Sequence, residues 1–130
     1  MPRRRAPKTR DRYPERLSWD GAVLLSHNHI SLLQGLLDRP RSRAESKRDL
    51  IAAAQPYVRR YRGSPPSWWT MNLATYTLHP SWVDWRRKGG RLVYRLLPRG
   101  RAILDGKVPA RIIGVGRFVP GRTSVGGSSA

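Results

Sequence analysis

The scarcity of large apolar residues is what most constrains how this chain can fold. Leu, Ile, Val and Phe together account for 28 of 130 residues, about 22%. A highly charged chain tends to stay disordered below about 20%. Five Trp and five Tyr add area that can be buried. The length suits a single domain, so we expect one small core with unstructured segments outside it.

The charge indicates a polyanionic partner. Lys and Arg number 26 against 8 Asp and Glu, which gives a net charge of +18. Nucleic acid is the partner we favour, because cations that bind phosphates release condensed counterions. Membrane surfaces and acidic proteins are the competing polyanions. Of the 26 cations, 22 are Arg, whose planar fork suits phosphates and guanine edges, although a GC-rich coding sequence would give the same excess.

The absence of cysteine excludes several classes of protein. Without Cys there are no disulfides, no Cys-ligated zinc fingers and no thiol catalysis, and the composition fits a reducing cytosol. No apolar run approaches the ~18 residues of a membrane-spanning helix. No apolar segment follows the Arg-rich N-terminus, unlike in a secretory signal. The sequence therefore predicts a cytoplasmic protein without a membrane partner.

Charge and composition divide the chain into three parts. Residues 1–18 are predicted to be a flexible basic arm, because like charges repel and its prolines block regular structure. Residues 19–115 form the candidate domain. Residues 116–130 end in Gly and Ser and are predicted to be a flexible tail.

Apolar spacing predicts two helices in the first half of the domain. The first covers roughly 22–37, where four residues line one face: Ile30, Leu33, Leu36 and Leu37. The second follows a capping box formed by Ser42 and Glu45. Its apolar face comprises Leu50, Ile51, Ala54, Val58 and Tyr61, and Pro56 is expected to kink or break it.

A third helix is predicted over residues 65–78, capped by Ser64. Trp69, Leu73 and Tyr76 follow a helical spacing and are assigned to its core face. That assignment turns Thr70 and Thr75 outward, with Trp68 and Asn72 on the flanks. Asn can contact adenine and Thr can contact phosphate, but this outer face carries no Arg or Lys, so it fits a protein-packing face equally well.

The second half of the domain changes to the period of a β-hairpin. Residues 82–87 alternate, Gly89-Gly90 form a turn, and residues 91–96 alternate again. Alternation places Trp82 and Trp85 on opposite faces, so one of the two is expected to be partly exposed. Residues 98–104 are predicted to be a short helix, and residues 110–115 a last strand.

The hairpin segment carries a resemblance to a known superfamily. Trp82-Val83, the basic turn Arg86-Arg87-Lys88-Gly89-Gly90, the return strand Val93-Tyr94-Arg95-Leu96 and the following Pro98-Arg99-Gly100-Arg101 resemble the wing of winged helix-turn-helix proteins. The resemblance implies a mainly α fold with a small β-hairpin wing. It also implies DNA binding, with the wing on the phosphate backbone and the third helix near the major groove.

The predicted nucleic-acid contacts come from four segments. Near the ends of the second helix, cations often touch the DNA backbone, although such charges are equally typical of solvated helix ends. The candidate residues are Arg86, Arg87, Lys88 and Arg91 in the wing, Ser67, Trp68, Thr70, Asn72 and Thr75 in the third helix, Arg3, Arg4 and Arg5 in the arm, and Arg41 and Arg43 before the second helix.

The five tryptophans allow two interpretations. Trp68-Trp69 and Trp82 or Trp85 could stack on the bases of single-stranded nucleic acid. Buried rings are the commoner use of Trp, and we expect most of the five to lie in the core.

No catalytic, metal or cofactor site is predicted. His27 and His29 form a lone H-x-H pair without a third ligand at suitable spacing. His79 has no Ser or Cys partner in sequence, and the C-terminal glycines match no phosphate-binding loop. We therefore expect a protein that is not an enzyme.

Three functions fit these observations. We favour a DNA-binding protein, a transcriptional regulator or accessory factor, that binds duplex DNA. An RNA-associated or ribosome-associated basic protein is the first alternative. A protein-interaction module that uses the aromatic helix 65–78 is the second, and a homodimer fits that case.

Overall fold

Two helices packed against each other form the centre of the domain. The computed structural model describes residues 14–62, 67–113 and 116–117. Helix α1 covers His27–Asp38 and helix α2 covers Lys47–Arg62. Gly35 of α1 lies directly on the backbone of α2, where an added Cβ would stand 2.6 Å from the carbonyl carbon of Ala53. The glycine therefore allows the two helices to approach closely and enclose the apolar faces predicted for them.

Helix α1 begins later than predicted. Residues Val23–Leu25 are not helical but form strand β1, so the predicted start at residue 22 is wrong. Ser26 caps the helix: its hydroxyl accepts a hydrogen bond from the backbone N–H of His29, at 3.1 Å. The imidazole of His29 in turn accepts one from the backbone N–H of Ser26, at 3.4 Å. The Ser26 cap sets the start of the helix, because residues that precede an N-cap lie outside the helix.

His29 must be neutral to hold this cap. Its Nδ1 accepts from Ser26, so the proton is on Nε2, which donates to the hydroxyl of Thr77 at 2.6 Å. The hydroxyl of Thr77 in turn donates a hydrogen bond to the backbone carbonyl of Ala74. Burial lowers the pKa of His29 to about 4. Protonation would place a second N–H against the donor of Ser26 and break the cap.

This arrangement predicts that stability falls on mild acidification. Below pH 6.5 the unfolded chain binds a proton at His29, while the folded chain stays neutral there until about pH 4. The free energy of unfolding should therefore drop by about 3 kcal/mol between pH 6.5 and pH 4. Urea unfolding across this range measures the slope. The same slope in a His29→Asn variant would contradict the assignment.

Helix α2 also begins later than predicted. The proposed cap Ser42 lies in a 3-10 turn, η2 (Pro40–Ser42), and the next two residues form strand β2 (Arg43–Ala44). The cap is instead Ser46, whose hydroxyl accepts from the backbone N–H of Asp49 at 3.0 Å. The Ser42–Glu45 capping box is therefore wrong. Pro56 lies inside one continuous helix and does not end it.

Helix α3 covers Trp68–Tyr76 and is capped by Ser67, whose hydroxyl accepts from the backbone N–H of Thr70 at 3.1 Å. The predicted cap at Ser64 lies outside the described residues. The period of this helix was predicted correctly, but its orientation was not. Met71, Asn72, Ala74, Thr75 and Leu78 face the core, whereas Trp69, Leu73 and Tyr76 are exposed.

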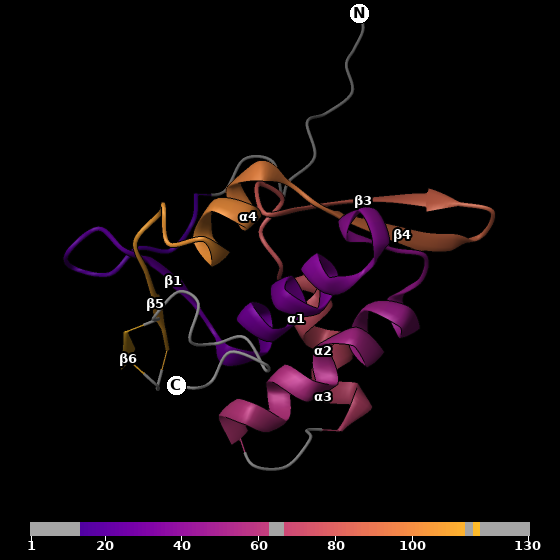
Figure 1. The fold of residues 1–130 in the computed structure, drawn as a ribbon, viewed down its shortest axis with the longest axis horizontal. Helices are drawn as coiled ribbons and strands as arrows, with labels where there is room; N and C mark the ends of the chain where they lie inside the picture. The colour runs from indigo at the N-terminus through magenta and orange to yellow at the C-terminus, as the bar shows by residue number, and fades with distance from the viewer. Residues whose placement is uncertain (1–13, 63–66, 114–115, 118–130) are drawn as a thin grey trace, which may run out of the picture.

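The predicted hairpin is confirmed. Strand β3 (Val83–Lys88) pairs antiparallel with strand β4 (Arg91–Leu96), and Gly89 and Gly90 both have positive φ in the turn. Strand β2 adds to the other edge of β4, which gives a sheet with the order β2-β4-β3. The tip of the hairpin projects from one end of the molecule (Figure 1).

A second small sheet lies at the opposite end (Figure 1). Helix α4 (Pro98–Leu104) follows the hairpin as predicted and leads to strand β5 (Ala110–Ile112). Strand β5 pairs parallel with β1, and strand β6 (Gly116–Arg117) pairs with β5. The described residues therefore form a small α/β domain with four helices, which is compatible with the predicted helical domain that carries a β-hairpin. None of these helices is both long enough and apolar enough to cross a membrane.

Residues before position 18 contact the domain. Glu15 accepts two hydrogen bonds from the guanidinium of Arg99, at 2.6 and 2.9 Å, and one from the indole N–H of Trp82, at 2.5 Å. The Arg99 guanidinium holds the pKa of Glu15 below its usual value. The carboxylate thus ties the start of the described chain to α4 and to Trp82, the residue before β3, although the sequence predicted an arm up to residue 18.

Candidate nucleic-acid interface

Strand register gathers cations on the outer face of the β2-β4-β3 sheet. Directly opposed residues of antiparallel strands share a face, and the opposed pairs here include Asp84 with Arg95, Lys88 with Arg91, and Arg43 with Arg95. One face therefore carries five cations and one carboxylate. We call it the basic sheet face, and it comprises Arg43, Asp84, Arg86, Lys88, Arg91 and Arg95.

The single carboxylate orients its neighbours. Asp84 is 3.2 Å from the guanidinium of Arg86 and 3.7 Å from that of Arg95. A hollow of about 110 Å³ lies among these side chains, Arg43 and Lys88. Arginine forks around a hollow of this size suit the oxygens of neighbouring phosphate groups, since each guanidinium can donate two parallel hydrogen bonds.

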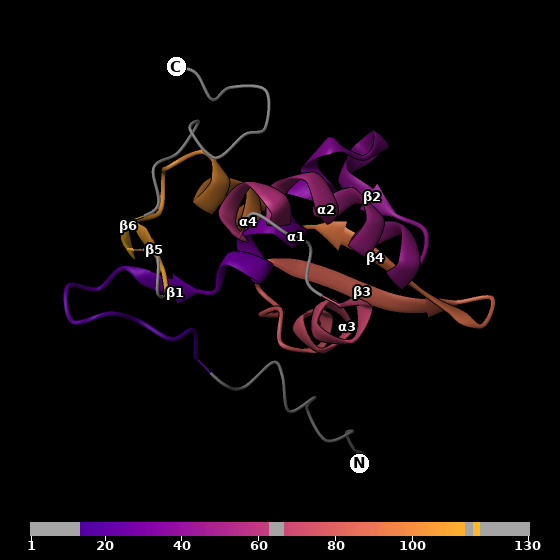
Figure 2. The ribbon, with the colours of Figure 1, turned by 90° about the horizontal axis from the view of Figure 1, so that it is seen from below.

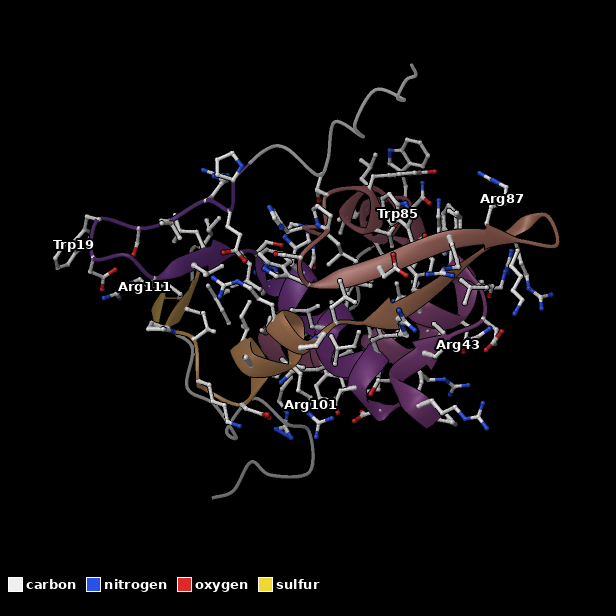
Figure 3. The ribbon with its side chains drawn as sticks, turned by 90° about the horizontal axis from the view of Figure 1, so that it is seen from above. Trp19, Arg43, Trp85, Arg87, Arg101 and Arg111 are labelled. Atoms are coloured by element: carbon white, nitrogen blue, oxygen red, sulfur yellow. The ribbon has the colours of Figure 1, made fainter. Side chains whose placement is uncertain are left out.

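The other face of the hairpin turns toward the helices. Trp85 packs edge-on against Tyr94, with ring centroids 5.9 Å apart, and Tyr94 is fully buried. The partial exposure of Trp85 and the burial of Trp82 confirm the predicted difference between the two. Arg87 follows Trp85 on this face and is exposed near the hairpin tip (Figure 3). The tip therefore carries cations on both faces.

Helix α3 does not present the predicted contact residues. Asn72 and Thr75 are buried, so the expectation that they reach a nucleic acid is corrected. The reason is packing: α3 contacts α1 and α2 through its smaller and more adaptable side chains, which leaves its large rings outside. Ser67 and Trp68 are exposed and Thr70 is half-buried, so these three remain available.

The prediction that most tryptophans lie in the core is also wrong. Trp19, Trp68 and Trp69 are exposed, and only Trp82 is buried. Trp19 lies at the end of the molecule farthest from the hairpin tip (Figure 3). The rings of α3 thus belong to a surface and not to the core.

The remaining predicted cations fall into two groups. Arg41 is exposed in η2, in a left-handed backbone conformation with φ of 59°. Arg43 joins the basic sheet face through strand β2, which places it beside the β3-β4 hairpin rather than at a helix end. Arg3, Arg4 and Arg5 lie outside the described residues.

Sequence reasoning missed Arg95. It belongs to the same alternating run as Arg91 and Val93, so a period of two would have assigned it to the face of Arg91. No such pattern predicts that β2 joins this sheet, because a strand of two residues is too short to show an alternation. Within the part of the chain that the structure describes, no three His, Asp or Glu side chains gather as metal ligands would.

No family model, no curated protein and no solved structure matches this chain. The assignment of function therefore depends on the geometry of its own residues.

Proposed function

We propose that this protein binds DNA as a winged helix-turn-helix domain and acts as a transcriptional regulator or accessory DNA-binding factor. The convergence of Arg43, Arg86, Lys88 and Arg95 around one hollow carries the proposal. Cations from β2, β3 and β4 meet there, although β2 lies about 40 to 50 residues before the other two strands in sequence.

The order of elements supports the fold assignment. Helices α1, α2 and α3 precede a basic hairpin, which is the layout implied by the resemblance in residues 82–104. The hairpin projects beyond the helices (Figure 1), as a wing must in order to follow a phosphate backbone. Backbone contacts fix position on the duplex without reading its sequence, so the basic sheet face supplies affinity rather than base specificity.

The test is a salt titration of the full chain on a duplex DNA fragment. Each neutralised phosphate contributes a slope of about −0.9 to the plot of log affinity against log salt. Six phosphate contacts, made by the four cations around the hollow together with Arg87 and Arg91, predict a slope of about −5. An affinity that does not change with salt would overturn the proposal. Preference for structured RNA of equal length would replace DNA by RNA as the partner.

A further inference from the structure

We propose that the exposed aromatic stripe of α3 binds unpaired bases, so that the preferred ligand is single-stranded nucleic acid. The stripe consists of Trp69, Leu73 and Tyr76, which stand on one side of the helix with exposed fractions of 63%, 49% and 54%. This inference deepens the proposed function and depends on it for the phosphate contacts.

The chemistry of the stripe suits base faces better than base edges. Helix α3 has no charged residue, and its amide, Asn72, is buried. The exposed rings of Trp69 and Tyr76 offer π-faces, on which any base can stack regardless of sequence. In a duplex the base faces are already stacked on one another, so only unpaired bases can use these rings.

A cation stands at one end of the stripe. The ammonium of Lys47 lies 4.0 Å from the centroid of the Tyr76 ring and 2.7 Å from its hydroxyl oxygen, to which it donates a hydrogen bond. A strand whose bases stack on the rings would place its phosphates beside them, within reach of this ammonium. The pairing of ring and cation is what a single-stranded nucleic-acid groove requires.

The wing continues the same surface. Thr75 and Tyr76 of α3 lie close to the hydroxyl of Tyr94, and Trp85 packs on the ring of Tyr94. Six residues lead from the end of α3 into β3 (Figure 2). Arg87 follows Trp85 on the helix-facing side of β3, and we expect it to contact a phosphate of the same strand.

The net charge of the chain favours nucleic acid, rather than a second copy of the chain, as the molecule that covers the stripe. Large exposed apolar faces usually mark an interface, and two copies could bury the stripe together. Each copy carries a net charge of +18, so their approach is opposed by like charges, whereas a polyanion is attracted.

The experiment compares an oligo(dT) strand of about 20 nucleotides with the matching duplex. Trp69→Ala in the full chain should weaken binding of the single strand by roughly 5- to 150-fold and leave duplex binding within about twofold. Trp69→Phe should restore most of the loss, because it keeps a ring. Binding of the single strand should also quench less tryptophan fluorescence in Trp69→Ala than in the parent chain.

Trp19→Ala is the matched control, because Trp19 is 91% exposed and lies far from α3. It should not change either affinity. Equal losses on strand and duplex, or no loss on the strand, would overturn the inference. Sedimentation that shows a dimer dissociated by Trp69→Ala would assign the stripe to self-association and also overturn it. If neither ligand binds in a salt-dependent way, the proposed function itself fails.

Discussion

Replacing Gly35 by alanine should lower the free energy of unfolding by about 3 kcal/mol. The added Cβ would stand 2.6 Å from the carbonyl carbon of Ala53, 2.7 Å from its oxygen and 2.7 Å from the nitrogen of Ala54. These are backbone atoms of α2, so no side-chain rotation can relieve the contact and the two helices must separate. Urea unfolding of the variant and the parent chain measures the difference.

The direction of the change in unfolding free energy distinguishes a clash between the helices from an effect of helix propensity. Helix propensity alone would make the same substitution stabilising by about 1 kcal/mol. Gly21→Ala provides a comparison, because its Cβ would meet no atom within 4 Å but its φ is +86°. That variant should lose only about 1 kcal/mol, from backbone strain. A Gly35→Ala protein as stable as the parent would show that α1 and α2 are not packed as closely as described.

Removing Arg86 and Arg95 together should weaken duplex binding by roughly 60-fold at about 0.1 M salt. Both guanidinium groups line the hollow on the basic sheet face and pair with Asp84. Loss of two phosphate contacts should also make the slope of log affinity against log salt shallower by about 1.8. Fluorescence anisotropy of a labelled duplex over a series of salt concentrations gives both values.

A second double variant separates position from net charge. Arg101→Ala with Lys107→Ala also removes two positive charges, and Arg101 likewise has an ion-pair partner, Asp105, at 3.7 Å. Arg101 lies on α4, away from the hairpin tip (Figure 3). This control should change affinity by no more than a few-fold. Equal losses in the two double variants would mean that the basic sheet face has no special role.

The hairpin could be predicted from sequence because its signals are local. Two alternating runs and the Gly89-Gly90 turn specify the pairing, and both glycines take the positive φ that such a turn requires. The short helix α4 followed from the same stretch. Arg86, Lys88 and Arg91 could therefore be placed on a β-hairpin without knowledge of the rest of the chain.

The orientation of α3 could not be predicted, because it depends on its neighbours. A stripe of Trp69, Leu73 and Tyr76 looks like a core face when burial of large rings is assumed. The space beside α1 and α2 is instead filled by Met71, Ala74 and Thr75. Strand β1 was missed for a similar reason. Its partner, β5, lies more than 80 residues later in the sequence, and residues 23–25 alone carry no signal for a strand.

The parallel pairing of β1 with β5 has a consequence for how the chain is made. It joins Val23 to Ala110, so a nascent chain released before residue 110 leaves β1 without its parallel partner strand, although the β3-β4 hairpin is already complete at Leu96. Shortening the protein to its basic hairpin and helices would therefore expose an unpaired strand edge, which is a template for aggregation. Strand β5 therefore pairs with β1 only after most of the domain has been synthesised.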